Sequence, residues 1–287
     1  MAARQHDRLG PITVIDGGMG KELARIGAPF RQPEWSAAAL LDDPDAVATA
    51  HRNFVASGAQ VIIVNSYAVV PFHIGDERFA ARGRELAELA GRLARQVAGE
   101  ADRPIRVAAS LPPLFGSYAP ERFDPEAAPE LYRILIEAQA PFVDLWLVET
   151  IASVAEAEAA AAALDRAEVG GERWFAFSLA DEPVDHDPSI GPVLWSGEAV
   201  ADGAKVALAG GADAILLNCA PPEAVTRALP EVVDAVAERP TGAAPVPIGA
   251  YANGFPPKPA VYTSNSVILG RREDLTPDGY AEHVDRW

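Results

Sequence analysis

The sequence predicts an α/β fold of the (β/α)8, TIM-type barrel class. Short β-rich apolar runs recur along the chain, and most are apolar at successive positions, which is typical of parallel strands covered on both faces. Helical patterns separate these runs without a break in composition. The predicted strands are Ile12–Asp16, Val61–Tyr67, Ile105–Leu111, Leu145–Thr150, Trp174–Leu179, Ala214–Cys219 and Val246–Tyr251. A doubly wound open sheet is the alternative, but the glycines at 17, 18 and 20 do not form the GxGxxG pattern of a dinucleotide site.

Helix boundaries between these strands follow from capping residues. Asp43-Pro44 predicts a helix start, with Gly58 as its terminator. Ser153 and Glu156 have the spacing of a capping box and open an Ala-rich helix toward Glu168. A further helix lies between Ser196 and the glycine pair at 210 and 211. Polar, Pro- and Gly-containing loops are predicted from 181 to 192 and from 256 to 259.

The chain is predicted to form a single domain over residues 1–287, with the eighth strand of the barrel missing. Thr276-Pro277 predicts a last helix whose apolar side would carry Tyr280, Val284 and Trp287. An eighth strand is expected a few residues later, but Trp287 ends the sequence. Because a seven-stranded barrel leaves two unpaired edges, we expect either that the natural chain continues or that another segment fills the gap.

Composition excludes several classes of function. The net charge is −17 and the pI about 4.7, so the basic surface that nucleic-acid binding needs is absent. No apolar run reaches the ~18 residues of a membrane helix, and the polar N-terminus does not resemble a signal peptide. One cysteine rules out a disulfide within the chain, which fits a reducing compartment. We expect a soluble, cytoplasmic protein without nucleic-acid or membrane partners, and a homo-oligomer remains open.

Polar side chains end several of the predicted strands, where barrel enzymes place their reactive groups. Glu149 follows a run of four apolar residues, and a buried carboxylate is costly unless it is paired. It is either part of a structural ion pair or the anchor of a cationic ligand. Asp16 precedes two glycines and either caps that turn or shares the ligand role with Glu149.

Cys219 ends the sixth predicted strand and is either a packed core residue or one ligand of a soft-metal site. The histidines are scattered. His51 falls on the apolar side of its helix, while His73 lies near the expected mouth of the barrel and is a weaker ligand candidate. Trp35 and Tyr67 either pack in the core or add cation–π attraction beside a cation site.

Taken in order, the motifs resemble those of the homocysteine S-methyltransferase family, and the resemblance covers nearly the whole chain. They are Asp16-Gly17-Gly18-Met19-Gly20-Lys21-Glu22-Leu23, Trp35-Ser36, His51 through Phe54 with Ser57-Gly58-Ala59, Asn65-Ser66-Tyr67, Glu149-Thr150, Asn218-Cys219 and Tyr251-Ala252-Asn253. The resemblance implies a (β/α)8 barrel that transfers a methyl group to the sulfur of homocysteine and yields methionine. It also implies that Asp16 and Glu149 hold the substrate's ammonium group, that Asn218, Trp35 and Tyr67 help bind the substrate, and that Cys219 is a zinc ligand.

The zinc site is incomplete in this sequence. The resemblance implies two further cysteine ligands as an adjacent pair after strand eight, and the chain contains only Cys219. A longer chain carrying that pair, or a relative without zinc, would explain the departure. A metal-free barrel lyase or aldolase with Glu149 as general base and a non-catalytic amino-acid-binding relative are the alternatives. The methyl donor stays open among S-methylmethionine, S-adenosylmethionine, betaine and a methylated folate.

Overall fold

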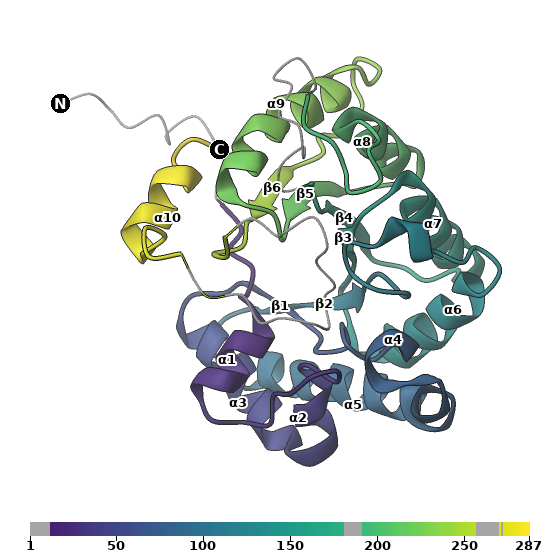
Figure 1. Cartoon of the computed structure of the whole chain (residues 1–287), viewed down its shortest axis with the longest axis vertical. Helices are drawn as coiled ribbons and strands as arrows, with labels where there is room; N and C mark the ends of the chain where they lie inside the picture. The colour runs from purple at the N-terminus through teal and green to yellow at the C-terminus, as the bar shows by residue number, and fades with distance from the viewer. Residues whose placement is uncertain (1–11, 181–190, 257–269, 271) are drawn as a thin grey trace.

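Uninterrupted apolar runs form the centre of the molecule, as expected for strands covered on both faces. In the computed structural model, which describes residues 12–180, 191–256, 270 and 272–287, these runs make a six-stranded parallel sheet in the order β1-β2-β3-β4-β5-β6. The strands are β1 (Val61–Ile63), β2 (Arg106–Leu111), β3 (Leu145–Ile151), β4 (Glu172–Phe177), β5 (Ala214–Asn218) and β6 (Ile248–Tyr251). The sheet curls around a central axis, and the helices lie outside it (Figure 1).

Helices alternate with the strands and cover the outer face of the sheet (Figure 1). They are α1 (Met19–Arg25), α2 (Ala37–Asp42), α3 (Pro44–Ala56), α4 (Pro71–Ile74), α5 (Asp76–Glu100), α6 (Ala128–Gln139), α7 (Val154–Ala167), α8 (Val200–Ala209), α9 (Pro222–Ala237) and α10 (Pro277–Val284), with short 3-10 turns at Pro120–Arg122 and Ala140–Phe142. Among the described residues, no helix combines the length and apolar character needed to cross a membrane.

Side-chain caps confirm two of the predicted helix starts, while the helix predicted after Ser196 begins at Val200, and its N-cap Ala199 makes no side-chain bond. The Asp43 carboxylate accepts a hydrogen bond from the Ala46 amide at 3.3 Å at the start of α3. The Ser153 hydroxyl accepts from the Glu156 amide at 3.2 Å at the start of α7. These bonds satisfy amide groups that the first helical turn leaves without partners. The loops predicted at 181–192 and 256–259 lie mainly outside the described residues.

The predicted first strand, Ile12–Asp16, was wrong in extent. Only a single parallel bridge joins Ile15 to Val61, and Ile12 and Val14 are 62% and 49% exposed. This segment has a strand neighbour on one side, so its outer side chains are not covered. The described part of the chain is therefore an α/β fold whose curled parallel sheet is consistent with a TIM-type barrel, and its six strands fall short of the eight that the barrel class implies.

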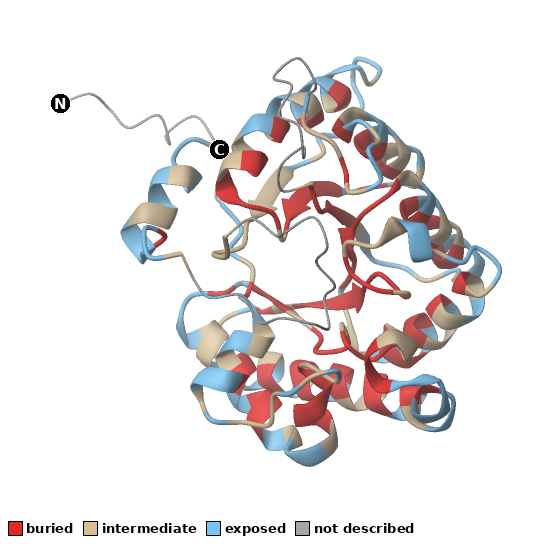
Figure 2. Ribbon diagram, in the orientation of Figure 1, coloured by how far each residue is buried: buried red, intermediate tan, exposed pale blue. Residues whose placement is uncertain are grey.

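The two faces of the sheet carry separate apolar clusters. The larger cluster fills the layer between the strands and the helices, where Figure 2 shows most of the buried residues. The smaller cluster comes from alternate strand residues that face the interior of the curled sheet. It consists of Val61, Ala108, Leu145, Leu147, Trp174, Ala176, Ala214 and Leu216. Because side chains alternate along a strand, the next interior positions toward the carboxyl ends are Ile63, Ser110, Glu149, Ser178 and Asn218.

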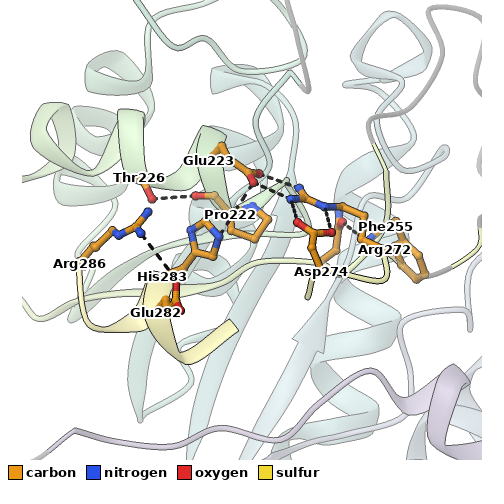
Figure 3. Close-up of polar contacts among 10 residues, drawn as sticks. Pro222, Glu223, Thr226, Phe255, Arg272, Asp274, Glu282, His283 and Arg286 are labelled. Atoms are coloured by element: carbon orange, nitrogen blue, oxygen red, sulfur yellow. Dashed lines mark hydrogen bonds and ion pairs between the residues drawn. The ribbon is translucent and has the colours of Figure 1, made fainter. Parts of the chain in front are cut away.

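The C-terminal segment is fastened to α9 by an ion-pair cluster (Figure 3). The Arg272 guanidinium donates to both carboxylate oxygens of Glu223, at 2.7 and 2.9 Å, and also pairs with Asp274. The Arg272 amide donates to the Gly254 carbonyl at 2.9 Å. These contacts connect the first turn of α9, the segment after β6 and the approach to α10.

Candidate active site at the carboxyl ends of the strands

Asp16 lies beside the end of β1 and is only 8% exposed. Its Oδ2 atom accepts a hydrogen bond from the Ile63 amide at 2.8 Å, and its own amide donates to the Val61 carbonyl at 2.9 Å. Oδ1 is buried and has no hydrogen-bond partner among the described residues. Asp16 therefore bonds across to a strand instead of capping the glycine turn, and it keeps one carboxylate oxygen available for a ligand.

Glu149 reaches the interior from the carboxyl end of β3 and is 7% exposed. Its Oε1 atom accepts from the Ser110 hydroxyl at 2.5 Å. Within the described residues, no lysine, arginine or histidine forms an ion pair with it, so the structural ion pair considered above is absent there. Burial raises the pKa of Glu149 to about 7, and the Ser110 hydrogen bond works in the opposite direction.

The two carboxyl groups act on each other. Burial raises the pKa of Asp16 well above its ordinary value, the Ile63 amide opposes this shift, and the negative charge of Glu149 adds to it. Two coupled carboxyl groups in one low-dielectric region are unfavourable unless a proton or another cation joins them. The arrangement suits the binding of an ammonium group.

Two tyrosines border the same cluster. The Tyr67 hydroxyl lies 2.5 Å from the Ser117 hydroxyl, and burial, together with the charges of Cys219 and Glu149, raises its pKa. The Tyr251 hydroxyl is buried without a hydrogen-bond partner in the described part of the chain. Burial raises the pKa of Tyr251, and Glu149, Cys219, Tyr67 and Asp16 add to the shift. Tyr251 therefore lies within electrostatic reach of both acids, of Cys219 and of Tyr67.

Cys219 follows β5 in a left-handed backbone conformation, with φ of 52°. Its amide donates to the Tyr251 carbonyl at 3.2 Å, and its carbonyl accepts from the Asn253 side chain at 2.7 Å. The thiol is partly exposed. A non-glycine residue with positive φ is strained and persists where its surroundings hold it, which is common at functional sites.

Asn218 is fully buried at the end of β5, and its side chain bonds to β3, which is two strands away in the sheet. Its amide nitrogen donates to the Thr150 hydroxyl at 2.9 Å and to Cys219 Sγ at 3.4 Å. Its Oδ1 atom accepts from the Thr150 amide at 3.2 Å. Thr150 also has a positive φ, of 59°, although it is β-branched. Asn218 thus links the ends of β3 and β5 at the cysteine, and its predicted part in shaping the substrate pocket remains a prediction.

Trp35, His73 and His51 are packed among rings or apolar groups. The Trp35 ring lies edge-on to Phe30 and to His73, with centroids 5.7 and 6.2 Å apart. His73 Nδ1 is 3.1 Å from the Pro33 carbonyl, and its ring is 6.3 Å from that of Tyr67. Trp35 is therefore separated from Tyr67 by one ring. Burial lowers the pKa of His51 to about 4, which suits a neutral core histidine.

Sequence reasoning did not single out Gln139. It is the last residue of α6, on the outer layer, and it hydrogen-bonds to Ser110 and Ser66. No strand-end pattern identifies a helical glutamine, because its partners are fixed only when the helix packs on the sheet.

The described residues do not complete a zinc site. Structural and catalytic zinc sites use at least three protein ligands. The described part of the chain holds no group of three histidine, cysteine, aspartate or glutamate residues that could bind a metal. Cys219 is the only cysteine in the sequence, and its thiol is a group of the kind that zinc binds.

Comparison with known proteins identifies the family of this chain. A family profile described as homocysteine S-methyltransferase matches residues 13–287. Homocysteine S-methyltransferase 1 of Zea mays is 30% identical over 239 residues, covering 75% of this chain and 71% of the relative. Homocysteine S-methyltransferase 3 of Arabidopsis thaliana is 30% identical over 75% of this chain and 68% of its own. Selenocysteine methyltransferase of Astragalus bisulcatus is 26% identical over 97% of this chain and 85% of its own.

A solved structure shares the fold. The homocysteine methyltransferase MmuM of Escherichia coli, in its metallated form, aligns with a TM-score of 0.65 and 24% identity, covering 86% of this chain and 93% of its own. At that identity the likeness speaks for the fold alone. The profile match over nearly the whole sequence and the similarity to the curated enzymes establish that this chain belongs to the homocysteine S-methyltransferase family.

Proposed function

We propose that the chain methylates homocysteine at the cluster formed by Asp16, Glu149 and Cys219. Asp16 and Glu149 bind the ammonium group of the acceptor, and the acceptor sulfur lies beside Cys219. Membership of the family makes the chain a methyltransferase that acts on homocysteine. The roles of the individual residues are the proposal.

The observation that carries this proposal is the pair of buried carboxyl groups without basic partners. Asp16 and Glu149 are 8% and 7% exposed, and neither forms an ion pair with a basic side chain among the described residues. A bound ammonium group would neutralise the repulsion and stabilise both carboxylates. An amino-acid ligand supplies such a group.

We further propose that the methyl donor is a sulfonium or quaternary ammonium cation. The chain has a net charge of −17, and the cluster is bordered by acids and by the aromatic rings of Tyr67 and Tyr251, which favour a cation. The acceptor reacts as the thiolate, its proton having passed to solvent: the sulfur attacks the methyl carbon, the new carbon–sulfur bond forms, and the electron pair of the breaking bond returns to the donor heteroatom. Opposite charges are neutralised in this step, so a site that excludes water favours it.

Cys219 is proposed as one zinc ligand. Zinc converts a bound thiol to the thiolate, which is the nucleophilic form. Since the described residues supply only one ligand of this kind, the remaining ligands would lie outside them, and the steps above do not depend on the metal. The metal-free lyase or aldolase and the non-catalytic binder lack a comparable supporting observation, because the family profile favours methyl transfer.

The test uses two charge-neutral, nearly isosteric substitutions. Asp16→Asn retains an acceptor for the Ile63 amide, and Glu149→Gln retains one for Ser110. Each should raise KM for homocysteine by about 100-fold, because a buried charge partner of the ammonium is lost. Glu85→Gln, at an exposed helix position, is the matched control and should leave KM unchanged. Unchanged KM in both site variants would contradict the assignment.

A further inference from the structure

A buried hydrogen-bond chain leads from helix α6 to the Glu149 carboxylate. It contains Gln139, Ser66 and Ser110, each 0% exposed, and ends at Glu149 Oε1. None of the three polar residues belongs to the cluster proposed above. This series of hydrogen bonds therefore connects the outer helical layer to the interior of the sheet.

The Gln139 side chain makes the backbone hydrogen bonds to β2 that β1 would make if it were longer. Along β2, the Ala108 carbonyl accepts from the Val64 amide at 2.9 Å, so this side of β2 faces β1. β1 stops at Ile63, and the backbone groups of Ser110, two residues beyond Ala108, have no strand partner on that side. The Gln139 side chain bonds to both: Oε1 accepts from the Ser110 amide at 3.0 Å, and Nε2 donates to the Ser110 carbonyl at 3.1 Å.

The remaining bonds of Gln139 fix its own orientation. Nε2 also donates to the Leu135 carbonyl at 3.0 Å, and Oε1 accepts from the Ser66 hydroxyl at 2.9 Å. The amide thus has two donor bonds and two acceptor bonds, which is its full capacity. A fully satisfied buried amide holds its partners in one arrangement.

The bonds from Gln139 fix the backbone of Ser110, whose side chain contacts Glu149. With both backbone groups held by Gln139, its hydroxyl donates its single proton to Glu149 Oε1 at 2.5 Å. Glu149 Oε2 makes no hydrogen bond to another described residue. The Ser110 hydroxyl therefore determines that Oε1 of Glu149 bonds to the protein and that Oε2 is left for a ligand.

We propose that Ser110 and Gln139 are positioning residues for acceptor binding: Gln139 fixes Ser110, and Ser110 orients Glu149 so that Oε2 meets the acceptor's ammonium group. This rests on the proposed role of Glu149. A hydrogen bond to a charged group contributes enough to change affinity by about 10-fold or more.

The test is a double-mutant cycle on acceptor affinity. Ser110→Ala should raise KM for homocysteine about 10-fold with little change in kcat, and Ser110→Thr, which keeps the hydroxyl, should restore it to within about 3-fold. In the Glu149→Gln background, Ser110→Ala should change KM by less than about 2-fold, since the negative charge that Ser110 orients toward the ammonium group is gone. Ser178→Ala, at the end of β4, removes an equally buried hydroxyl that has no partner among the described residues and serves as the control.

Two further readouts separate positioning from a purely structural role. With 4-mercaptobutanoate, an acceptor without the ammonium group, Ser110→Ala should match the wild type. Gln139→Met should weaken homocysteine binding with the same selectivity, and if it fails to fold the serine cycle decides. Equal effects of Ser110→Ala with and without Glu149, or on both acceptors, would overturn the proposal. Failure of the wild-type chain to methylate homocysteine would instead overturn the proposed function.

Discussion

Several residues at the carboxyl ends of the strands have energetically unfavourable surroundings or backbone conformations. Glu149 is buried without a basic partner among the described residues. Thr150, which follows it in the sequence, and Cys219, whose sulfur is 3.7 Å from the Thr150 hydroxyl, adopt left-handed backbone conformations. Such arrangements lower stability and persist where other contacts enforce them. The Asn218 side chain provides those contacts by bonding to both Thr150 and Cys219.

Replacing Glu149 with glutamine should stabilise the unliganded protein at alkaline pH. Because the folded-state pKa is about 7 and the ordinary value is 4.5, the folded state holds the proton more tightly between these values. Stability therefore falls as pH rises from about 4.5 to 7, and the cost at pH 8 is about 3 kcal/mol. Thermal unfolding should show Glu149→Gln above the wild type at pH 8 and close to it at pH 4.5. An equal difference at both values would refute the raised pKa.

At the scale of elements, helix ends and one ion-pair cluster set how the outer layer meets the sheet. α10 begins at Pro277, with the Thr276 hydroxyl accepting from the Gly279 amide at 3.1 Å, as its sequence predicts. Its attachment depends on contacts that the sequence does not reveal. The Tyr280 hydroxyl donates to the Ala252 carbonyl at 3.2 Å, and the Trp287 indole donates to the Thr226 hydroxyl at 2.8 Å.

Arg272→Ala should loosen α10 from α9. Arg272 is 20% exposed and forms a two-pronged bond to Glu223, which lowers the Glu223 pKa and is worth about 1 kcal/mol after solvent screening. Hydrogen exchange should accelerate several-fold in the amides of α10 and remain unchanged in β3. The exposed Arg82 of α5, paired with Glu85, is the control, and Arg82→Ala should leave α10 exchange unaltered. Unchanged exchange in Arg272→Ala would show that the hydrogen bonds of Tyr280 and Trp287 are enough to hold α10 in place.

At the scale of the whole molecule, the curled sheet brings residues from distant parts of the chain to one rim. Asp16 and Tyr67 lie near the end of β1, Glu149 near the end of β3 and Cys219 after β5, and parallel strands present these ends on the same side. The metal question also belongs to this scale, since zinc needs ligands from several elements.

The 287-residue chain should bind far less than one zinc per molecule. Its described residues offer Cys219 and no group of three metal-binding side chains. Elemental analysis after zinc loading and gel filtration should give a clearly substoichiometric value, equal to that of Cys219→Ala. A stoichiometric content that is lost in Cys219→Ala would show that residues outside the described ones complete the site.

The sequence by itself determined the parallel α/β character, most strand positions, the starts of α3, α7 and α10, and the placement of Glu149 and Cys219 at the carboxyl ends of β3 and β5. These follow from local patterns: apolar continuity, capping residues and the position of polar groups after buried runs. Only the tertiary structure decided that Asn218 bonds to Thr150, that Tyr251 borders both acids, and that Gln139 completes the edge left by β1. Hydrogen-bond partners of buried polar groups come from neighbours in space, and the packing of helices on the curled sheet sets those neighbours.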